Sequence, residues 1–218
     1  MGSEINASDL VRTAKVVFWD FDGVIKESVD VKTRAFQKLF VEYGAEVTEK
    51  IRLHHEANGG MSRFEKLPIY MDFANVKSTD EKVNRLCEKF SDLVVDGVVN
   101  SQWVPGAEIF IRSNTHQQIF IVISATPIEE LLGIIDRLNL KTSFESIFGA
   151  PTSKTEAIEA SLYRLSISAA DAVMIGDASA DLESASLNKV PFILRRHCSN
   201  SKLAESFAGI TINDLIGL

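Results

Sequence analysis

The feature that most constrains this chain is a short apolar run that ends in two acidic residues and a glycine. Residues 16–19 read Val-Val-Phe-Trp, and Asp20, Asp22 and Gly23 follow within the next few positions. A run this short, rich in β-branched and aromatic residues, is typical of a buried strand in a parallel sheet. Ligands of open α/β sheets bind at the carboxyl ends of the strands. The stretch therefore predicts a pair of carboxylates at a reaction site.

The chemistry of this pair is specific. Asp20 at the strand end can serve as a nucleophile or a metal ligand, since carboxylates form covalent intermediates such as aspartyl-phosphates. Asp22 lies one pleat period further on and can reach the same pocket, and Gly23 permits a sharp turn or a close backbone approach. Two neighbouring carboxylates repel, which suits one anionic nucleophile, one proton donor and a divalent metal. The alternative is a strand followed by an ordinary Asp-Gly turn.

Composition restricts the class of protein. The 218 residues suggest one domain, or one domain with an insertion, and 45% hydrophobic with 24% charged residues is ordinary for a soluble globular chain. A net charge of -7 argues against nucleic-acid binding through a basic surface. The sequence shows neither a signal peptide nor an apolar run long enough to span a membrane. We expect a cytoplasmic protein without nucleic-acid or membrane partners, and a reducing compartment fits its two cysteines.

Strand and helix patterns alternate along most of the chain. After a loose leader over residues 1–13, strand patterns are predicted at residues 15–20, 118–123, 146–149, 172–175 and 190–194. Helical patterns separate the later strands, which indicates βαβ units and an α/β fold with a Rossmann-like parallel sheet. Pro191 suggests that the last of these strands lies at an edge or begins with the proline.

A helical block interrupts the alternation directly after the first strand. Residues 27–98 carry helical spacing and no strand pattern. We therefore predict a core domain formed by residues 14–26 and 99–218, with residues 27–98 as an inserted helical cap over the carboxyl edge of the sheet.

Helix starts are signalled by capping residues. Thr126, Pro127 and Glu129 predict a capped helix start, and Ser153 with Glu156 predicts a second capping box.

Further polar residues follow the later strands. Ser124 comes directly after an apolar run, and the backbone N–H groups of Ala125 and the next residue would open a helix, an arrangement suited to phosphate. Lys154 supplies a cation near a helix start. Asp177 and Asp181 follow another strand, where carboxylates can hold a hard cation such as Mg2+. Taken singly, each residue is also explained as a helix cap or a solvated surface group.

The ordered set resembles the four motifs of the haloacid dehalogenase superfamily. The matching segments are Asp20-Phe21-Asp22-Gly23-Val24, Ile121-Val122-Ile123-Ser124-Ala125, Lys154, and Gly176-Asp177-Ala178-Ser179-Ala180-Asp181. The position of the helical block resembles the C1 cap of the phosphoglycolate phosphatase and β-phosphoglucomutase-like branch. Two positions depart from the common pattern: Glu27 stands where many relatives have Asp, and Ala178 stands where Ser or Thr is frequent.

The resemblance implies a role for each motif residue. Asp20 would attack phosphorus and form an aspartyl-phosphate. Asp22 would protonate the leaving oxygen and then deprotonate water, for which we expect a raised pKa in the closed state. Ser124 and Ala125 would hold phosphate oxygens, and Lys154 would steady both Asp20 and the transferring phosphoryl group.

The resemblance also implies a magnesium site. Its ligands would be Asp20, the backbone carbonyl of Asp22, and Asp177, while Asp181 would bind the ion directly or support the site. Gly23 is assigned to the substrate pocket.

The cap contains one informative segment. Residues 58–66 read Asn-Gly-Gly-Met-Ser-Arg-Phe-Glu-Lys, and glycines before Ser62 suit a loop that opens a helix, where Arg63 could bind an anion. The segment is similar to the Gly-x-Ser-Arg segment of β-phosphoglucomutase-like proteins, whose Arg holds a substrate phosphate. The alternative is a capped helix with a surface arginine. His54 and His55 are interpreted as surface or cap-interface residues.

These observations predict a Mg2+-dependent phosphatase of a small phosphomonoester, of the phosphoglycolate or sugar phosphate type, that acts as a monomer or homodimer. A phosphosugar mutase is the nearest alternative, but such relatives carry His ten residues after the second Asp, where this chain has Lys32. A non-catalytic phospho-ligand-binding protein is the third possibility, although it would not need the full set of catalytic groups.

Overall fold

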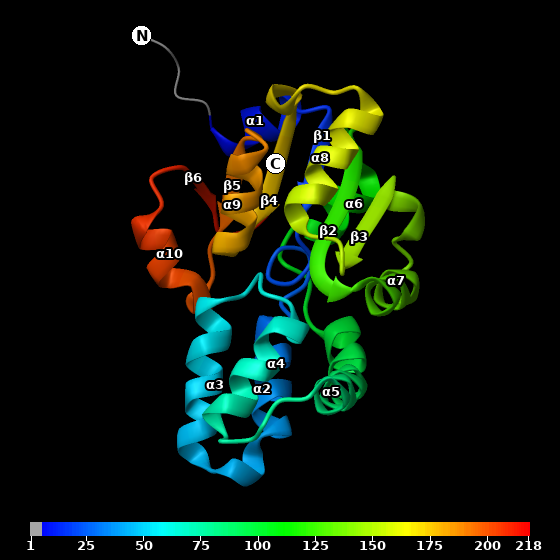
Figure 1. Cartoon of the computed structure of the whole chain (residues 1–218). Helices are drawn as coiled ribbons and strands as arrows, with labels where there is room; N and C mark the ends of the chain where they lie inside the picture. The colour runs from blue at the N-terminus through cyan, green and yellow to red at the C-terminus, as the bar shows by residue number, and fades with distance from the viewer. Residues whose placement is uncertain (1–5) are drawn as a thin grey trace.

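A single parallel sheet forms the centre of the molecule. The computed structural model describes residues 6–218, and the six strands lie in the order β3-β2-β1-β4-β5-β6 (Figure 1). The strands are β1 (Val16–Trp19), β2 (Ile119–Pro127), β3 (Ser146–Ala150), β4 (Ala172–Gly176), β5 (Phe192–Arg195) and β6 (Ile210–Ile212). The chain winds outward from β1 in both directions, so the strand order reverses between β1 and β4, where doubly wound folds bind their ligands. The predicted α/β, Rossmann-like fold is confirmed.

The register of the central strands brings their ends together. Trp19, the last residue of β1, pairs with Val122 of β2 and with Ile175 of β4. The side chains of β1 alternate between two apolar cores, with Val17 and Trp19 on one face of the sheet and Val16 and Phe18 on the other. Burial on both faces explains why these strands are continuous apolar runs.

Helices cover both faces of the sheet. Side chains of α1 (Ala7–Thr13), α6 (Ala107–Ser113) and α7 (Ile128–Arg137) pack into the core that contains Trp19. Side chains of α8 (Lys154–Leu165) and α9 (Ser179–Leu187) pack into the core that contains Phe18. Short 3-10 helices lie at residues Val41–Tyr43, Lys141–Ser143, Ala169–Asp171 and Cys198–Asn200, and α10 (Ser201–Ser206) precedes β6. None of the described helices is both long and apolar enough to cross a membrane.

Four helices form the block between β1 and α6. They are α2 (Val29–Leu39), α3 (Ala45–Ala57), α4 (Arg63–Phe73) and α5 (Asp80–Asn100), and they gather at one end of the sheet (Figure 1). Aromatic side chains join them: the rings of Phe36 and Phe90 are 4.1 Å apart and those of Phe36 and Tyr70 are 5.1 Å apart. Because α5 continues to Asn100, the predicted cap boundary at residue 98 falls inside the last turn of a helix. The division into two domains stays a prediction.

Two predictions near the chain ends are wrong. The expected leader contains α1, which Asn6 caps by accepting a hydrogen bond from the Asp9 N–H at 2.9 Å, and Val11 of this helix is buried; residues 1–5 lie outside the described part. The strand after Pro191 is neither last nor at an edge, since β5 lies between β4 and β6. Because the proline precedes the strand, it removes no donor from the pairing of β5.

The predicted helix cap at Thr126 is also wrong. Strand β2 continues to Pro127, which takes the cap position of α7 without a side-chain hydrogen bond. The Thr126 hydroxyl is engaged by Lys32 instead. The capping box of Ser153 and Glu156 is confirmed at the start of α8.

Candidate active site

Asp20 is fixed at the carboxyl end of β1. Its backbone N–H donates to the Ile175 carbonyl at 3.0 Å, which continues the pairing of β1 with β4, and its side chain is buried. Burial raises the pKa of Asp20 well above the usual value, the charges of Asp181 and Asp177 raise it further, and Lys154 opposes the shift. The site therefore holds more negative charge than its own cation balances.

Lys154 links two of these carboxylates. It is the first residue of α8, and its Nζ donates to Asp20 Oδ1 at 2.7 Å and to Asp181 Oδ1 at 2.5 Å. Burial lowers the pKa of Lys154, but the charges and hydrogen bonds of the two aspartates outweigh burial and raise it. The lysine therefore stays charged and fixes the position of the Asp20 carboxylate.

Asp181 organises the loop between β4 and α9. Its Oδ2 accepts hydrogen bonds from the backbone N–H groups of Asp177 and Ala178 at 3.1 and 3.0 Å, while its Oδ1 faces Lys154. Burial raises the pKa of Asp181 despite the attraction of Lys154. Both of its oxygens therefore already accept hydrogen bonds within the protein.

Two residues far along the chain hold Asp177, and no sequence motif pointed to either of them. His197 Nε2 lies 2.7 Å from Asp177 Oδ2, and the Asn200 side chain donates to the Asp177 backbone carbonyl at 2.7 Å. Gly23 also lies against the Asp177 side chain. Its φ is +77°, and a Cβ at this position would overlap Asp177 Oδ2. A side chain at residue 23 is therefore excluded by backbone conformation and by space.

The acidic cluster suits a hard cation. Asp20, Asp177 and Asp181 each offer a carboxylate oxygen, and these atoms all lie within 4.8 Å of one another. Carboxylate oxygens are the ligands that Mg2+ takes in proteins, and buried carboxylates that raise one another's pKa gain from a divalent charge. The donor set therefore fits Mg2+. The Asp22 side chain is not part of this cluster.

Asp22 points instead toward the helical block. Its Oδ1 accepts a hydrogen bond from Ser28 Oγ at 2.6 Å, and its Oδ2 forms an ion pair with Lys32 of α2, which also donates to Thr126 Oγ1 at 2.7 Å. Burial raises the pKa of Asp22, but the charge of Lys32 and the two hydrogen bonds outweigh burial and lower it. The raised pKa expected for Asp22 in the closed state stays a prediction, and the sequence did not show that Lys32 faces Asp22.

Ser124 and Ala125 line the same pocket as Asp20 and Lys154. Ser124 lies within β2 and is 2% exposed, and its Oγ accepts a hydrogen bond from the Thr126 backbone N–H at 3.2 Å. The hydroxyl proton remains available for a bound oxygen, since in this contact Ser124 acts as the acceptor.

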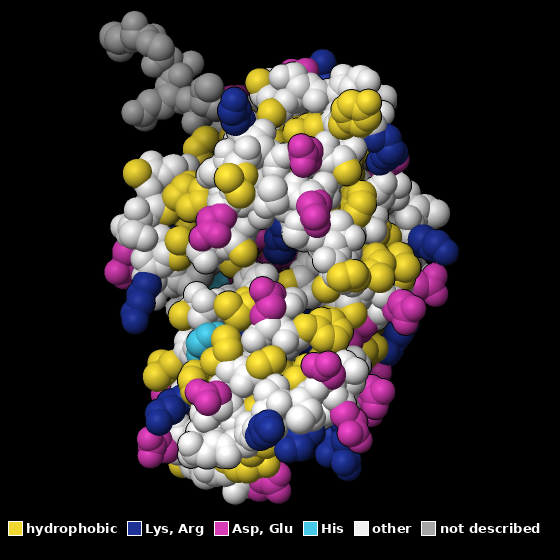
Figure 2. Space-filling model, in the orientation of Figure 1, with side chains coloured by type: hydrophobic (Ala, Val, Ile, Leu, Met, Phe, Trp, Pro, Cys, Tyr) yellow, Lys and Arg dark blue, Asp and Glu magenta, His cyan; other side chains and the backbone are white. Residues whose placement is uncertain are grey.

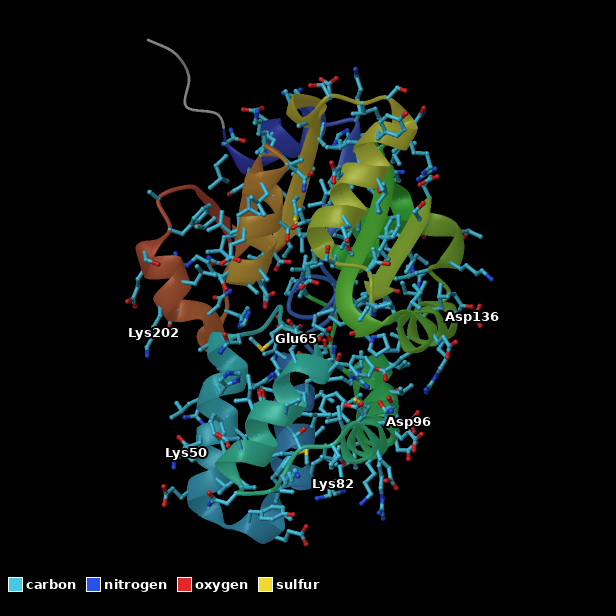
Figure 3. All side chains as sticks on the ribbon, in the orientation of Figure 1. Lys50, Glu65, Lys82, Asp96, Asp136 and Lys202 are labelled. Atoms are coloured by element: carbon cyan, nitrogen blue, oxygen red, sulfur yellow. The ribbon has the colours of Figure 1, made fainter. Side chains whose placement is uncertain are left out.

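The pocket is bounded by the helical block on its other side. Figure 2 shows the surface hollowed between the sheet and the helices, and Figure 3 shows Glu65, near the start of α4, at the end of the block that faces the sheet. Side chains of α2, α3, α4 and α5 complete the lining.

The loop before α4 lies directly against the fourth motif. A Cβ added at Gly60 would lie 2.5 Å from the Ala180 Cβ, and one added at Gly59 would lie 3.4 Å from the Ala178 Cβ. The small residues Ala178 and Ala180 thus lie in close contact with the cap loop.

Arg63 lines the pocket but is already engaged. Its guanidinium donates to both carboxylate oxygens of Glu130 at 2.6 and 2.8 Å and to Ser91 Oγ at 2.7 Å, and it lies 4.5 Å from the Phe90 ring centroid. The residue is buried, so the alternative of a surface arginine is wrong. A substrate contact by Arg63 stays a prediction.

Comparison with known proteins identifies the family. The family model described as haloacid dehalogenase-like hydrolase matches residues 17–194. The chain belongs to this family of hydrolases, as the four sequence motifs predicted. No curated protein sequence matches the chain significantly.

Several solved structures share the fold. β-Phosphoglucomutase from Clostridium difficile superposes with a TM-score of 0.74 at 20% identity, covering 93% of this chain and 92% of that one. CbbY from Rhodobacter sphaeroides, in complex with xylulose-(1,5)bisphosphate, gives 0.76 at 14% identity, covering 94% and 96%. A predicted phosphoglycolate phosphatase from Haemophilus somnus gives 0.73 at 12% identity, covering 93% and 95%. At these identities the likeness establishes the fold.

Proposed function

We propose that this chain is a Mg2+-dependent phosphatase that hydrolyses a small phosphomonoester through an aspartyl-phosphate on Asp20. One observation carries the proposal: Asp20 lies at the strand-order reversal with Lys154 at 2.7 Å, inside a cluster of three carboxylates. Phosphoryl transfer depends mainly on positioning and on neutralising charge, and this arrangement supplies both.

Each residue has a defined part in the proposed reaction. The Asp20 carboxylate attacks phosphorus, and Lys154 restrains the carboxylate and balances charge on the transferring group. The Ser124 hydroxyl and the Ala125 backbone N–H donate to phosphoryl oxygens. Asp20, Asp177 and the Asp22 backbone carbonyl would hold Mg2+, which would supply positive charge to balance that of the transferring phosphoryl group.

Asp22 is proposed as the acid and base of the two half-reactions. Its ion pair with Lys32 favours the deprotonated form, which is the form required when water attacks the aspartyl-phosphate. For the first half-reaction the carboxyl must carry a proton, so Lys32 and Asp22 have to separate when substrate binds. Since Lys32 lies on α2 of the helical block, movement of this block relative to the sheet is the motion proposed to do this.

The proposed substrates are small phosphomonoesters of the phosphoglycolate or sugar phosphate type. The fold is shared with CbbY bound to xylulose-(1,5)bisphosphate, which supports a phosphorylated small molecule as ligand. A cytoplasmic location, the absence of nucleic-acid and membrane partners, and a monomeric or homodimeric state remain predictions.

The test is phosphate release from a panel of phosphomonoesters, with Mg2+ and with chelator. We expect release that depends on Mg2+ and is lost in the Asp20→Asn variant. No release from any compound by the folded parent protein in Mg2+ would contradict a phosphatase. Conversion of β-glucose 1-phosphate to its 6-phosphate under those conditions would identify a mutase.

A further inference from the structure

Lys66 differs from the other cations that line the pocket. Within the described residues, three of the four pocket-lining Lys and Arg side chains have a carboxylate partner: Lys32 pairs with Asp22, Arg63 with Glu130, and Lys154 with Asp20 and Asp181. Lys66 is 1% exposed, and among described residues its hydrogen-bond partner is the ring of His55, with Nζ and Nδ1 2.8 Å apart. An ammonium has three donors, so this contact leaves two of them for other acceptors.

Burial of the Lys66 charge costs free energy, and no ion pair with a described carboxylate offsets this cost. A buried charge is normally paired, and an unpaired one destabilises the protein. His55 is also buried, and burial together with the charge of Lys66 lowers the pKa of His55 well below its usual value, so the ring remains neutral and acts as an acceptor. Burial lowers the pKa of Lys66 to about 7, and the charge of Lys32 lowers it further while those of Asp22 and Asp177 oppose this.

The helix holds Lys66 where a ligand would meet it. Arg63, Lys66, Leu67 and Tyr70 are the buried residues at helical spacing on α4, so Lys66 belongs to the inner face of this helix. The Lys66 Nζ lies 5.9 Å from the Phe36 ring centroid, and both side chains line the pocket that contains Asp20 and Ser124. The ammonium thus faces the phosphoryl site from the cap side of one shared pocket.

We propose that Lys66, backed by His55, binds a second anionic group of the substrate, either a carboxylate or a second phosphate. This inference rests on the proposed phosphatase function and narrows its substrate class to phosphorylated acids and bisphosphates. Asp20, Lys154 and Ser124 engage the phosphoryl group that is transferred, while Lys66 takes the other anionic end. Arg63 is not required for this step, because Glu130 neutralises it.

The test measures binding, so that it does not depend on turnover. Every protein carries Asp20→Asn to prevent hydrolysis and is titrated calorimetrically in Mg2+ with two matched probe pairs. The pair 2-phosphoglycolate and ethyl phosphate differs by a carboxylate, and the pair fructose 1,6-bisphosphate and fructose 6-phosphate differs by a phosphate. We expect the member that carries the additional anionic group, in at least one pair, to bind about ten-fold more tightly, the scale of one charge-assisted contact. The pair that shows the preference identifies the group.

Substitution then assigns the preference to Lys66. We expect Lys66→Met to remove it and Lys89→Met, which deletes an exposed lysine of the same helical block, to keep it. Lys66→Gln keeps a hydrogen-bond donor for His55. This variant replaces Lys66→Met in the titrations if circular dichroism shows that the Met variant is unfolded. A protein with no preference in either pair, or a preference that survives in the folded Lys66 variant, would overturn the proposal. Phosphate release by the parent protein reports on the phosphatase function separately.

Discussion

Arg63 and Glu130 join α4 of the helical block to α7 beside the sheet through two hydrogen bonds of 2.6 and 2.8 Å. Their side chains are 4% and 7% exposed, so the pair is buried. A buried ion pair need not stabilise a fold relative to apolar residues, but removal of one partner leaves an unpaired charge in the interior. The contact therefore fixes how the block sits against α7.

Loss of Glu130 should destabilise the protein strongly. We expect Glu130→Ala to lower the free energy of unfolding by about 3–5 kcal/mol, because the Arg63 charge is then buried alone. Urea unfolding followed by circular dichroism measures the change. The matched control is Asp96→Ala, which breaks the exposed contact between Asp96 and Arg137 at 2.8 Å across the same two regions (Figure 3). Asp96→Ala should lower the free energy of unfolding by less than about 1 kcal/mol. Equal losses in the two variants would contradict the special importance of the buried Arg63–Glu130 pair.

Gly23 should be required for the metal site rather than for stability alone. Gly23→Ala introduces a Cβ that overlaps Asp177 Oδ2 and forces a φ of +77° on a non-glycine residue. Gly44→Ala imposes a similar strain at φ +92°, with no atom within 4 Å of the added Cβ. Both variants should lose about 1–3 kcal/mol of stability from backbone strain.

The two glycine variants should differ in activity. A displaced Asp177 carboxylate should lower the Mg2+-dependent rate of Gly23→Ala by about 100-fold, as misplacement of about 1 Å does. Gly44→Ala should keep the parent rate. Steady-state kinetics over a Mg2+ titration measures this difference in rate. A Gly23→Ala enzyme with the parent rate would show that activity does not depend on the close contact between Gly23 and Asp177.

Close packing of the cap loop on α9 should be necessary for turnover. Gly60→Ala places a Cβ 2.5 Å from that of Ala180, so we expect the loop to shift and kcat/KM to fall by roughly 10- to 100-fold. The double variant Gly60→Ala with Ala180→Gly restores the space and should recover most of the rate, at about 0.5–1 kcal/mol of stability for glycine in a helix. No recovery in the folded double variant would exclude a steric cause.

Lys66 should make stability depend on pH. Its pKa of about 7 in the folded protein lies below the ordinary lysine value near 10.4, so the unfolded chain binds one more proton between these two values. Stability therefore rises with pH over this interval, at no more than about 1.4 kcal/mol per pH unit. Relative to Lys66→Met, the parent should gain stability from pH 7 to 10. The charged and titratable groups around Lys66 are His55, Lys32, Asp22, Asp177 and Glu65.

Urea unfolding of both proteins at several pH values measures this difference. Titration of the other groups changes the free energy of unfolding of both proteins. Its effect therefore largely cancels in the difference between the parent and Lys66→Met. A stability difference that stays constant from pH 6 to 10 would show that Lys66 titrates normally.

The strand ends were predictable from the sequence because local pattern determines them. Asp20, Ser124 and Asp177 each follow a continuous apolar run, and parallel strands place their carboxyl ends at one edge. Lys154 was identifiable through the capping box of Ser153 and Glu156, which fixes where its helix begins. These signals are local, so a single sequence suffices for them.

The partners of these residues were not predictable, because they depend on packing between distant segments. Glu130 lies 67 residues from Arg63, and His197 lies 20 residues from Asp177. In the sequence, Lys32 was notable only because mutases carry a histidine at this position. Its contact with Asp22 is visible only in the folded structure. Lys66 did leave a signal, since it lies on the same helix face as Leu67 and Tyr70, where a charged residue is unusual.

The central claim is covalent chemistry at Asp20, and trapping the intermediate tests it most directly. The parent protein is quenched in acid during turnover of its best phosphomonoester in Mg2+, and the acyl phosphate is reduced with borohydride, which converts the carboxyl carbon to an alcohol. We predict that peptide mass spectrometry will find homoserine at residue 20 and nowhere else. Turnover with an unmodified Asp20, or with reduction at another aspartate, would contradict the account.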